Sequence, residues 1–563
     1  MKIADYFHRY RSGDRLADVI ADIRAQVERT RDFNVWIRLL DENELAPYLD
    51  RLQSIPMEDR PLWGIPFAIK DNIDLAGIAT TAGCPEFSYT PERSAFVVQQ
   101  LIDAGAIPIG KTNLDQFATG LVGTRSPHGV TRNALDTHLI SGGSSSGSAV
   151  AVALGQVAFS LGTDTAGSGR VPAAMNRLVG IKPTRGRWSL AGVVPACQTL
   201  DCVSLFTNDV RDARTISEVL SHFDRSDPWS RQVVPQGFDV GHTRYGVASQ
   251  AALAGESCEQ DVINRYLNVA DRLNATTIDI APFLEAARLL YEGPWVAERF
   301  AAIEDFIRLH RDAMHPVTEE IIGAAETLTA IDSFKAQYQL QALKHVVDQF
   351  FADIDVLALP TIPAVYTIEQ VLADPVATNS HLGTFTNFVN LLDLCAVAVP
   401  IDESPIGITF IAPAGCDEAL LDIATNFLSG SQEPSKPRAG EFHLAVCGAH
   451  LSGQPLNNDL VTRGAYLVEQ STTAPTYRLY ALPDGKRPAL VRSDSGQAIE
   501  IEIWSIPLHA VGSFLQTVAP PLGLGSVETA DGRWVNSFIA EARATDGATD
   551  ITRYGGWRSY RSG

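Results

Sequence analysis

The sequence predicts an α/β protein in which helices flank a large mixed β-sheet, followed by a smaller, mainly β domain. Between residues 63 and 195, short β-branched runs alternate with helical stretches and Gly-rich turns, a pattern typical of α/β layer folds. Strand-like runs resume after a long helical region, and a polar, Pro-containing segment then precedes a tail with further strand-like stretches.

The elements of the first part can be placed in chain order. Helical periodicity with little Gly or Pro predicts one or two amphipathic helices between residues 16 and 52. Strands are expected at residues 65–69 and 106–109, and a long apolar helix is expected after the Gly-Ser-rich segment that begins at residue 141. Residues 283–350 are again helical. The sheet should then resume with three strands, at residues 355–359, 395–400 and 407–411.

Chain length and a change in composition predict two domains. Single hydrophobic cores stop growing at roughly 250 to 300 residues, so a chain of 563 residues needs more than one. The stretch SGSQEPSKPRAG combines Ser, Gly, Pro and charge without apolar periodicity, which is typical of a linker. We therefore expect a first domain at residues 1–429, a linker at 430–441 and a C-terminal domain at 442–563.

Composition excludes several classes of function. A net charge of −21 argues against nucleic-acid binding, which needs clustered Lys and Arg. The N-terminus lacks the pattern of a secretory signal, and the longest apolar run is too short for a membrane span. Seven cysteines without a C-x-x-C pair suit reduced thiols. We expect a cytoplasmic protein that binds no membrane, metal or cofactor.

Two separated motifs carry the chemistry. Residues 141–173 read SGGSSSGSAVAVALGQVAFSLGTDTAGSGRVPA, and residues 63–74 read WGIPFAIKDNID. In both, the sequence resembles the amidase signature family, and the resemblance extends over about residues 16–428. It implies the amidase-signature fold and a catalytic triad with Lys70 as the base, Ser144 as a proton relay after a cis peptide bond, and Ser168 as the nucleophile.

The chemistry of amide hydrolysis explains these residue types. A serine hydroxyl is a weak nucleophile and needs an adjacent base. Lys70 can serve only when neutral, so it should lie in a dry pocket that lowers its pKa. The turn Thr165-Ala166-Gly167-Ser168 can direct backbone N–H groups at the oxyanion of the tetrahedral intermediate. Ala166 stands where many relatives have Gly, and a methyl group should be tolerated there.

The Gly-Ser-rich loop is open to other interpretations. It could be a flexible turn without function, and a phosphate-binding loop would need a Lys after Gly147 that is absent. Residues 143–147 also satisfy G-x-S-x-G, which would make Ser145 the nucleophile of an α/β-hydrolase. That fold needs a later acid and a later His, but His450 and His509 lie beyond the predicted linker, in a different predicted domain.

Segments outside the shared motifs point to a substrate. Residues 115–127, 200–206 and 382–400 and the tail from residue 442 resemble the allophanate hydrolase family. This resemblance implies hydrolysis of allophanate, a small anionic substrate, to ammonia and carbon dioxide. Its carboxylate-binding pair falls on Tyr291 and Arg299, which a spacing of eight would place on one face of a single helix. Gly120 is a further substrate-contact candidate. An Arg in a surface ion pair is the alternative for Arg299.

The C-terminal domain and the partners follow from the same resemblance. The domain is similar to the β-rich, cyclotransferase-like domain of these enzymes, in which His450 and Arg553 are candidates for a role in decarboxylation; a domain that only packs or dimerises is equally consistent. We expect a homodimer and a functional association with urea carboxylase. A biuret or malonamate hydrolase, or an ammonia-supplying subunit, remain alternatives.

Overall fold

The computed structural model describes residues 1–238, 240–430 and 441–562 and divides into two compact units. The first unit comprises Met1–Val233 and Arg244–Ser429. The second comprises Val234–Thr243 and Gly430–Gly563, apart from the undescribed positions. Residues 431–440 of the predicted linker lie outside the described residues.

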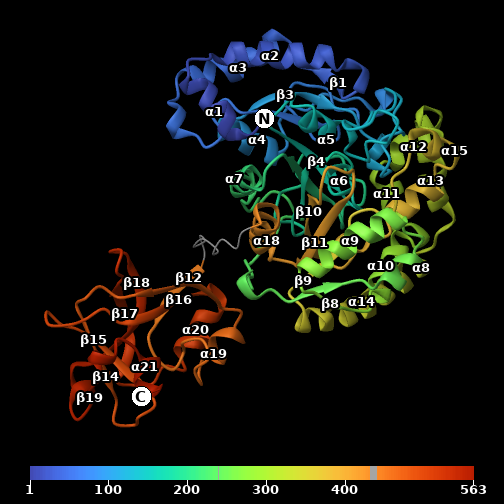
Figure 1. The fold of residues 1–563 in the computed structure, drawn as a ribbon. Helices are drawn as coiled ribbons and strands as arrows, with labels where there is room; N and C mark the ends of the chain where they lie inside the picture. The colour runs from blue at the N-terminus through green and yellow to red at the C-terminus, as the bar shows by residue number, and fades with distance from the viewer. Residues whose placement is uncertain (239, 431–440, 563) are drawn as a thin grey trace. The chain divides into compact units, whose positions relative to one another are not determined.

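An eleven-stranded mixed sheet forms the centre of the first unit (Figure 1). The strand order is β1-β3-β2-β4-β6-β5-β10-β11-β9-β7-β8, with β2 parallel to both β3 and β4. The strands are β1 (Trp36–Leu39), β2 (Pro66–Lys70), β3 (Ile107–Thr112), β4 (Phe159–Asp164), β5 (Val179–Lys182), β6 (Cys202–Thr207), β7 (Tyr245–Val247), β8 (Thr276–Thr277), β9 (Val356–Pro360), β10 (Leu394–Pro400) and β11 (Gly407–Pro413).

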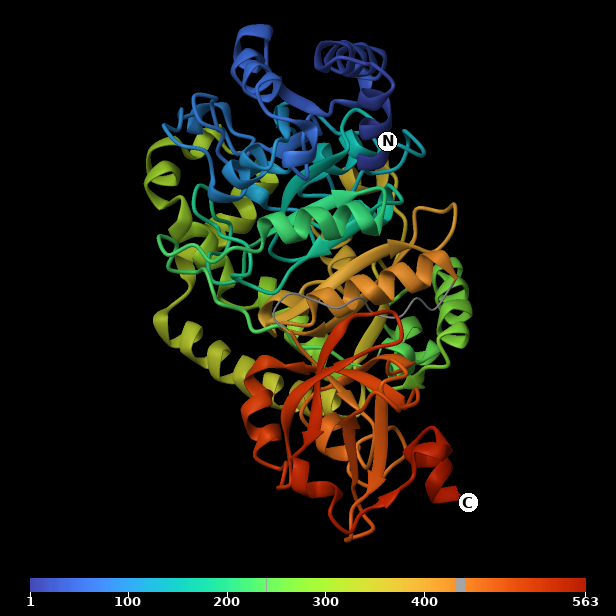
Figure 2. The same cartoon turned by 90° about the vertical axis from the view of Figure 1, so that its left-hand side faces the viewer.

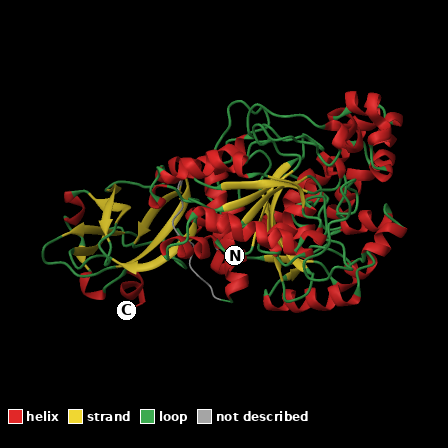
Figure 3. Cartoon of the chain, turned by 90° about the horizontal axis from the view of Figure 1, so that it is seen from above, coloured by secondary structure: helices red, strands yellow, loops and turns green. Residues whose placement is uncertain are grey.

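Helices pack on both faces of this sheet (Figure 3). One layer contains α5 (Ser146–Ala153) and α6 (Val171–Met175), which contact each other and the central strands. The other contains α4 (Phe96–Asp103), α7 (Val210–Leu220) and α18 (Asp417–Ser429). The N-terminal helices α1 (Ile3–Arg11), α2 (Leu16–Arg29) and α3 (Glu42–Gln53) are blue in Figures 1 and 2, and α3 packs against β3.

A further group of helices lies in the second half of this unit. It consists of α8 (Gln250–Gly255), α9 (Gln260–Arg272), α10 (Ala281–Glu292), α11 (Trp295–Ala302), α12 (Glu304–His310), α13 (Pro316–Gly323), α14 (Ala330–Asp353), α15 (Ile368–Ala373), α16 (Ala377–Leu382) and α17 (Phe388–Leu391). Because α10 packs against α11, α14 and α17, this group is tied together around α10. The predicted helical region at residues 283–350 is thus confirmed as several separate helices.

The predicted α/β class and its mixed sheet are confirmed, with two corrections to the elements. The helix expected after the Gly-Ser-rich segment is present as α5 but is short, because it ends at Ala153 and β4 begins at Phe159. Gly155, with a φ of +67°, provides the left-handed residue just past the helix end. The second correction is β1, a strand that the periodicity of residues 16–52 did not predict.

The second unit is mainly β, as predicted. A five-stranded sheet has the order β13-β16-β12-β18-β17, and a three-stranded sheet the order β15-β14-β19. The strands are β12 (Glu441–Val446), β13 (Tyr466–Thr472), β14 (Tyr477–Ala481), β15 (Pro488–Arg492), β16 (Glu500–Pro507), β17 (Leu522–Glu528), β18 (Trp534–Ala540) and β19 (Thr549–Asp550), with helices α19 (Asn458–Val461), α20 (Leu508–Leu515) and α21 (Trp557–Ser562). Its own core includes Tyr466, Ile503 and Trp557.

No helix within the described residues combines the length and the apolar character needed to cross a membrane.

Candidate active site

The topology of the sheet brings together the three residues of the predicted triad. Lys70 is the last residue of β2, and Ser168 lies in the turn after β4, the parallel neighbour of β2. Ser144 lies just before α5, which packs against both strands. Since parallel neighbours end at the same edge of a sheet, residues almost a hundred positions apart meet there.

The three side chains form a continuous chain of polar contacts. Lys70 Nζ lies 2.8 Å from Ser144 Oγ, and Ser144 Oγ lies 2.9 Å from Ser168 Oγ. The Gly143–Ser144 peptide bond is cis, as the family resemblance implies. All three residues are buried, with Ser168 only 2% exposed. A hydroxyl can both donate and accept, so this arrangement can carry a proton from Ser168 through Ser144 to Lys70.

The surroundings of Lys70 favour its neutral form. Burial lowers the pKa of Lys70 to about 7, against the opposing effect of nearby carboxylates, of which Asp115 has the largest. Thr163 Oγ1, 2.7 Å from Nζ, is its second polar partner. A lysine with such a pKa is substantially unprotonated near neutral pH and can act as a base.

A buried ion pair holds the turn that carries Ser168. The Arg170 guanidinium donates to both carboxylate oxygens of Asp164, at 2.9 Å each, and both side chains are fully buried. The backbone N–H of Gly169 also donates to Asp164. Although burial opposes its ionisation, Arg170 holds the pKa of Asp164 below its ordinary value. Arg170 therefore stabilises the turn that carries Ser168.

The same turn leaves backbone donors available for an oxyanion. Among the described residues, none accepts a hydrogen bond from the backbone N–H groups of Ala166, Gly167 or Ser168. Ala166 is not among the residues with positive φ, so its methyl group fits here without strain. Gly167 has a φ of +145°, and a Cβ there would collide with the Thr386 hydroxyl.

Ser145 lacks the surroundings of a nucleophile. Its Oγ lies 3.1 Å from the carbonyl oxygen of Thr163 and accepts from the backbone N–H of the same residue. These contacts attach the start of α5 to β4, a structural role that the α/β-hydrolase interpretation does not explain.

Arg299 is a buried cation beside the triad. It is 2% exposed, and its Nη1 donates to the Thr119 hydroxyl at 3.2 Å. In the part of the chain that the structure describes, no carboxylate lies within ion-pair distance of it, and its buried Nε has no hydrogen-bond acceptor. The alternative of a surface ion pair is therefore wrong.

Tyr291 meets Arg299, but not on one helix as predicted. Gly293 and Pro294 separate α10, which carries Tyr291, from α11, which carries Arg299. The guanidinium carbon lies 5.6 Å from the centre of the Tyr291 ring. The contact between the two residues thus comes from helix packing, and the prediction of a shared helical face is corrected.

Gly120 lies on a loop that contacts both Ser168 and Arg299. Ser168 Oγ lies 3.4 Å from the Gly120 carbonyl oxygen, and Thr119, the partner of Arg299, precedes Gly120. The loop is held by Asp115, whose carboxylate accepts backbone N–H groups of Val122, Gly123 and Arg125. One loop therefore reaches both Ser168 and Arg299.

The two candidates of the second unit are not brought together. His450 is half-buried between the rings of Phe514 and Phe538, and burial lowers its pKa. Arg553 is exposed and lies over the ring of its neighbour Tyr554. No contact between His450 and Arg553 is present among the described residues. No group of three or more potential metal ligands occurs among those residues either.

Sequence reasoning missed three polar residues that organise the site. Thr163 contacts Lys70, Thr119 contacts Arg299, and Asp201 contacts the oxyanion-loop residue Thr165. Thr163 could have been found from the topology, since it lies near the end of the strand beside β2. The contacts of Thr119 and Asp201 depend on loop conformation, and nothing in the sequence around either residue predicts them.

Comparison with known proteins identifies the family of both units. Residues 34–421 match the family described as Amidase, and residues 442–562 match the Allophanate hydrolase C-terminal domain. The chain is 43% identical to a urea amidolyase of Lachancea kluyveri and 42% identical to one of Saccharomyces cerevisiae. These matches cover 93% and 94% of this chain but only 31% of each relative, so the chain spans about a third of their length.

Solved structures share the fold over the whole chain. Allophanate hydrolase of Kluyveromyces lactis aligns with a TM-score of 0.85 and 40% identity, covering 100% of this chain and 99% of the other. The urea amidolyase of the same organism aligns with a TM-score of 0.84 and 39% identity, covering 100% of this chain and 36% of the other. The chain therefore belongs to the amidase family and carries an allophanate hydrolase C-terminal domain.

Proposed function

We propose that this protein is an allophanate hydrolase with Ser168 as nucleophile, Ser144 as proton relay and Lys70 as base. The observation that carries the proposal is the buried guanidinium of Arg299, which has no carboxylate partner among the described residues and lies one loop away from Ser168. A buried unpaired cation is unfavourable alone and is stabilised by an anionic ligand. The carboxylate of allophanate supplies that charge.

The reaction begins when Ser168 attacks the amide carbon. Its proton passes to Ser144, whose own proton passes to neutral Lys70, and the carbonyl oxygen becomes an oxyanion facing the turn Thr165–Ser168. The C–N bond then breaks, and the leaving nitrogen takes the proton back through Ser144 to depart as ammonia. The remaining acyl group stays esterified to Ser168.

Water completes the cycle by the same proton path. Neutral Lys70 accepts a proton from the attacking water through the Ser144 hydroxyl alone, because Ser168 Oγ is esterified at this stage. The proton returns through Ser144 to Ser168 Oγ as the ester bond breaks. The product is N-carboxycarbamate, which loses carbon dioxide to yield carbamate and then ammonia. We separately propose that the second unit assists this decarboxylation through His450. The lowered pKa of that imidazole and its aromatic surroundings support this role.

We also propose a homodimer and a supply of substrate from urea carboxylase, in the cytoplasm. The exposed apolar side chains Ile331, Phe334 and Tyr338 lie on one face of α14 and suit an interface with a second copy. The matches to relatives named urea amidolyase support the link to the breakdown of urea.

Ammonia release from a panel of amides tests the proposed activity. The purified protein is assayed with allophanate, biuret, malonamate, urea and a neutral amide, with Ser168→Ala as the control. We expect kcat/KM to be highest for allophanate, and Ser168→Ala to lower kcat by about 10⁴-fold or more. Arg299→Lys keeps the charge but loses the planar fork, so it should impair allophanate far more than the neutral amide.

The outcomes separate the alternatives. Activity only on biuret or malonamate would keep the triad but replace the substrate. Inactivity on every amide, with activity restored by a partner protein, would favour an ammonia-supplying subunit. Residual turnover by Ser168→Ala close to that of the unmodified protein would remove Ser168 from the mechanism.

A further inference from the structure

One segment between β5 and β6 touches both ends of the candidate substrate site. Residues 196–201 run beside the oxyanion turn on one side and beside α11 on the other. No residue of this segment belongs to the proposed triad.

Asp201 attaches the segment to the oxyanion turn. Its carboxylate is 4% exposed and accepts a short hydrogen bond from the Thr165 hydroxyl. It also accepts the backbone N–H groups of Ala196 and Cys197, at 2.8 and 3.1 Å. The carboxylate thus closes the segment on itself and holds the first residue of the turn.

Glu298 attaches the same segment to α11. Its two carboxylate oxygens accept the backbone N–H and the hydroxyl of Thr199, each at 2.7 Å. Cys197 Sγ makes a second contact, 3.4 Å from the carbonyl oxygen of Trp295 on α11. Glu298 immediately precedes Arg299, so these contacts fix the part of α11 from which the guanidinium extends.

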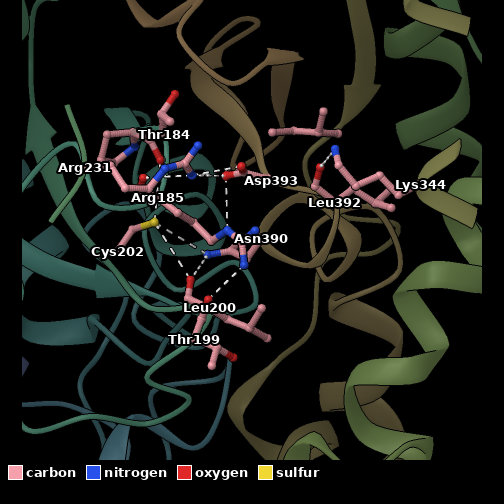
Figure 4. A network of polar contacts seen from close by, with 12 residues as sticks. Thr184, Arg185, Thr199, Leu200, Cys202, Arg231, Lys344, Asn390, Leu392 and Asp393 are labelled. Carbon is pink, nitrogen blue, oxygen red and sulfur yellow. Dashed lines mark hydrogen bonds and ion pairs between the residues drawn. The ribbon is translucent and has the colours of Figure 1, made fainter. Parts of the chain in front are cut away.

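The segment itself is held in place from a third side (Figure 4). Asn390 donates to the Leu200 carbonyl oxygen at 3.0 Å and also to the carbonyl oxygen of Asp164 at 2.8 Å. Arg185 donates to the Thr199 carbonyl oxygen at 2.8 Å. With its backbone held in this way, the segment can fix the distance between the oxyanion turn and α11.

Building on the proposed function, we propose that Glu298 and Asp201 are positioning residues that set the separation between Arg299 and the oxyanion turn. A substrate bound by a carboxylate at one end and attacked at an amide carbon at the other must match that separation. The segment at residues 196–201 therefore selects acyl chains by length, favouring allophanate and its isostere malonamate over succinamate, which is one methylene longer.

Competitive inhibition of allophanate hydrolysis by malonamate and succinamate tests this role. In the unmodified protein the Ki of succinamate should exceed that of malonamate by about tenfold or more, the effect of one methylene in a fitted pocket. Glu298→Ala should lower this ratio at least about threefold and raise the KM for allophanate, with a smaller change in kcat. Glu298→Gln can still accept from the Thr199 N–H and donate to its hydroxyl, so it should retain the ratio.

Glu304→Ala is the matched control, because it removes an exposed glutamate that pairs with Arg308 on the next helix and does not touch the segment. Asp201→Ala is the second variant; it should lower kcat by about ten- to a hundredfold by releasing Thr165. An unchanged inhibition ratio in a folded, active Glu298→Ala protein would overturn the positioning role. Absence of allophanate hydrolysis by the unmodified protein would instead contradict the proposed function.

Discussion

At the scale of single residues, the chemistry depends on where a lysine is buried. Lys70 is placed at the end of a central strand, where desolvation acts on it fully and the nearest carboxylates only partly compensate. The same burial that makes the ammonium unfavourable makes the amine an effective base. Its two hydroxyl partners, Ser144 and Thr163, accept from the ammonium and keep the amine aligned.

The pH dependence of the reaction follows from this lysine. Because burial lowers the pKa of Lys70 to about 7, the neutral, active form is lost as pH falls through that value. We expect kcat/KM to rise about tenfold per pH unit below the pKa and to level off above it. A profile from about pH 5.5 to 9 measures this. A flat profile through neutrality would contradict Lys70 as the base.

Lys70→Arg provides the control for this prediction. Arginine keeps a positive charge but is not deprotonated in proteins, so a role of the charge alone would survive the exchange. We expect kcat to fall about as far as for Ser168→Ala, since members of a triad act as a unit.

At the scale of elements, the turn after β4 rests on the buried pair of Asp164 and Arg170. Arg170→Met would leave the Asp164 carboxylate buried without its cation, which typically costs about 3–5 kcal/mol. The free energy of unfolding of the first unit in guanidinium chloride should fall by about that amount, and kcat should fall because the oxyanion donors lose their support. Arg308→Met, which removes an exposed ion pair on α12, should change stability by less than about 1 kcal/mol. Equal effects of the two variants would contradict a supporting role for the buried pair.

The elements also show how far sequence could predict this protein. The strands at β2, β3, β9, β10 and β11 were predicted within one to three residues, because their short apolar runs are bounded by Gly, Pro or charged residues. The apolar stretch around Gly155 was misassigned, since small apolar residues satisfy both helical and strand patterns. The triad residues came from local motifs, whereas their contacts with Thr163 and Asp201 come from chain segments that only the fold brings together.

The contact between Tyr291 and Arg299 also arises from the fold and not from the local sequence. Its spacing from Tyr291 suggested one helix, although Gly293 and Pro294 lay between them as a helix-breaking signal. The two side chains still meet, because α10 packs against α11. The pairing of the two residues came from the family resemblance, and only the shared helical face inferred from their spacing was wrong.

At the scale of the whole molecule, α14 presents an exposed apolar face. On α14, Ile331 is 66% exposed, Phe334 55% and Tyr338 71%. Positions three and four residues apart share one face of a helix, so these side chains form a stripe. Such a stripe is typical of an interface, and a second copy of this chain is the occupant that we propose.

Sedimentation equilibrium of the double variant Phe334→Glu/Tyr338→Glu tests that occupant. Truncated or charged interface aromatics each weaken association by about 2 kcal/mol or more, so the dimer Kd should rise by at least about a hundredfold. Leu372→Glu is the matched control, because Leu372 is a similarly exposed apolar residue, 59% exposed, on α15.

Since α14 packs against α10, which carries Tyr291, a dimer through this stripe would also stabilise the helix whose Tyr291 contacts Arg299. We therefore expect the monomeric variant to have a higher KM for allophanate. Adding Ser168→Ala to this variant should lower kcat by the same factor as in the unmodified protein. A variant that remains dimeric, or an unmodified protein that is monomeric at micromolar concentration, would remove α14 as the interface.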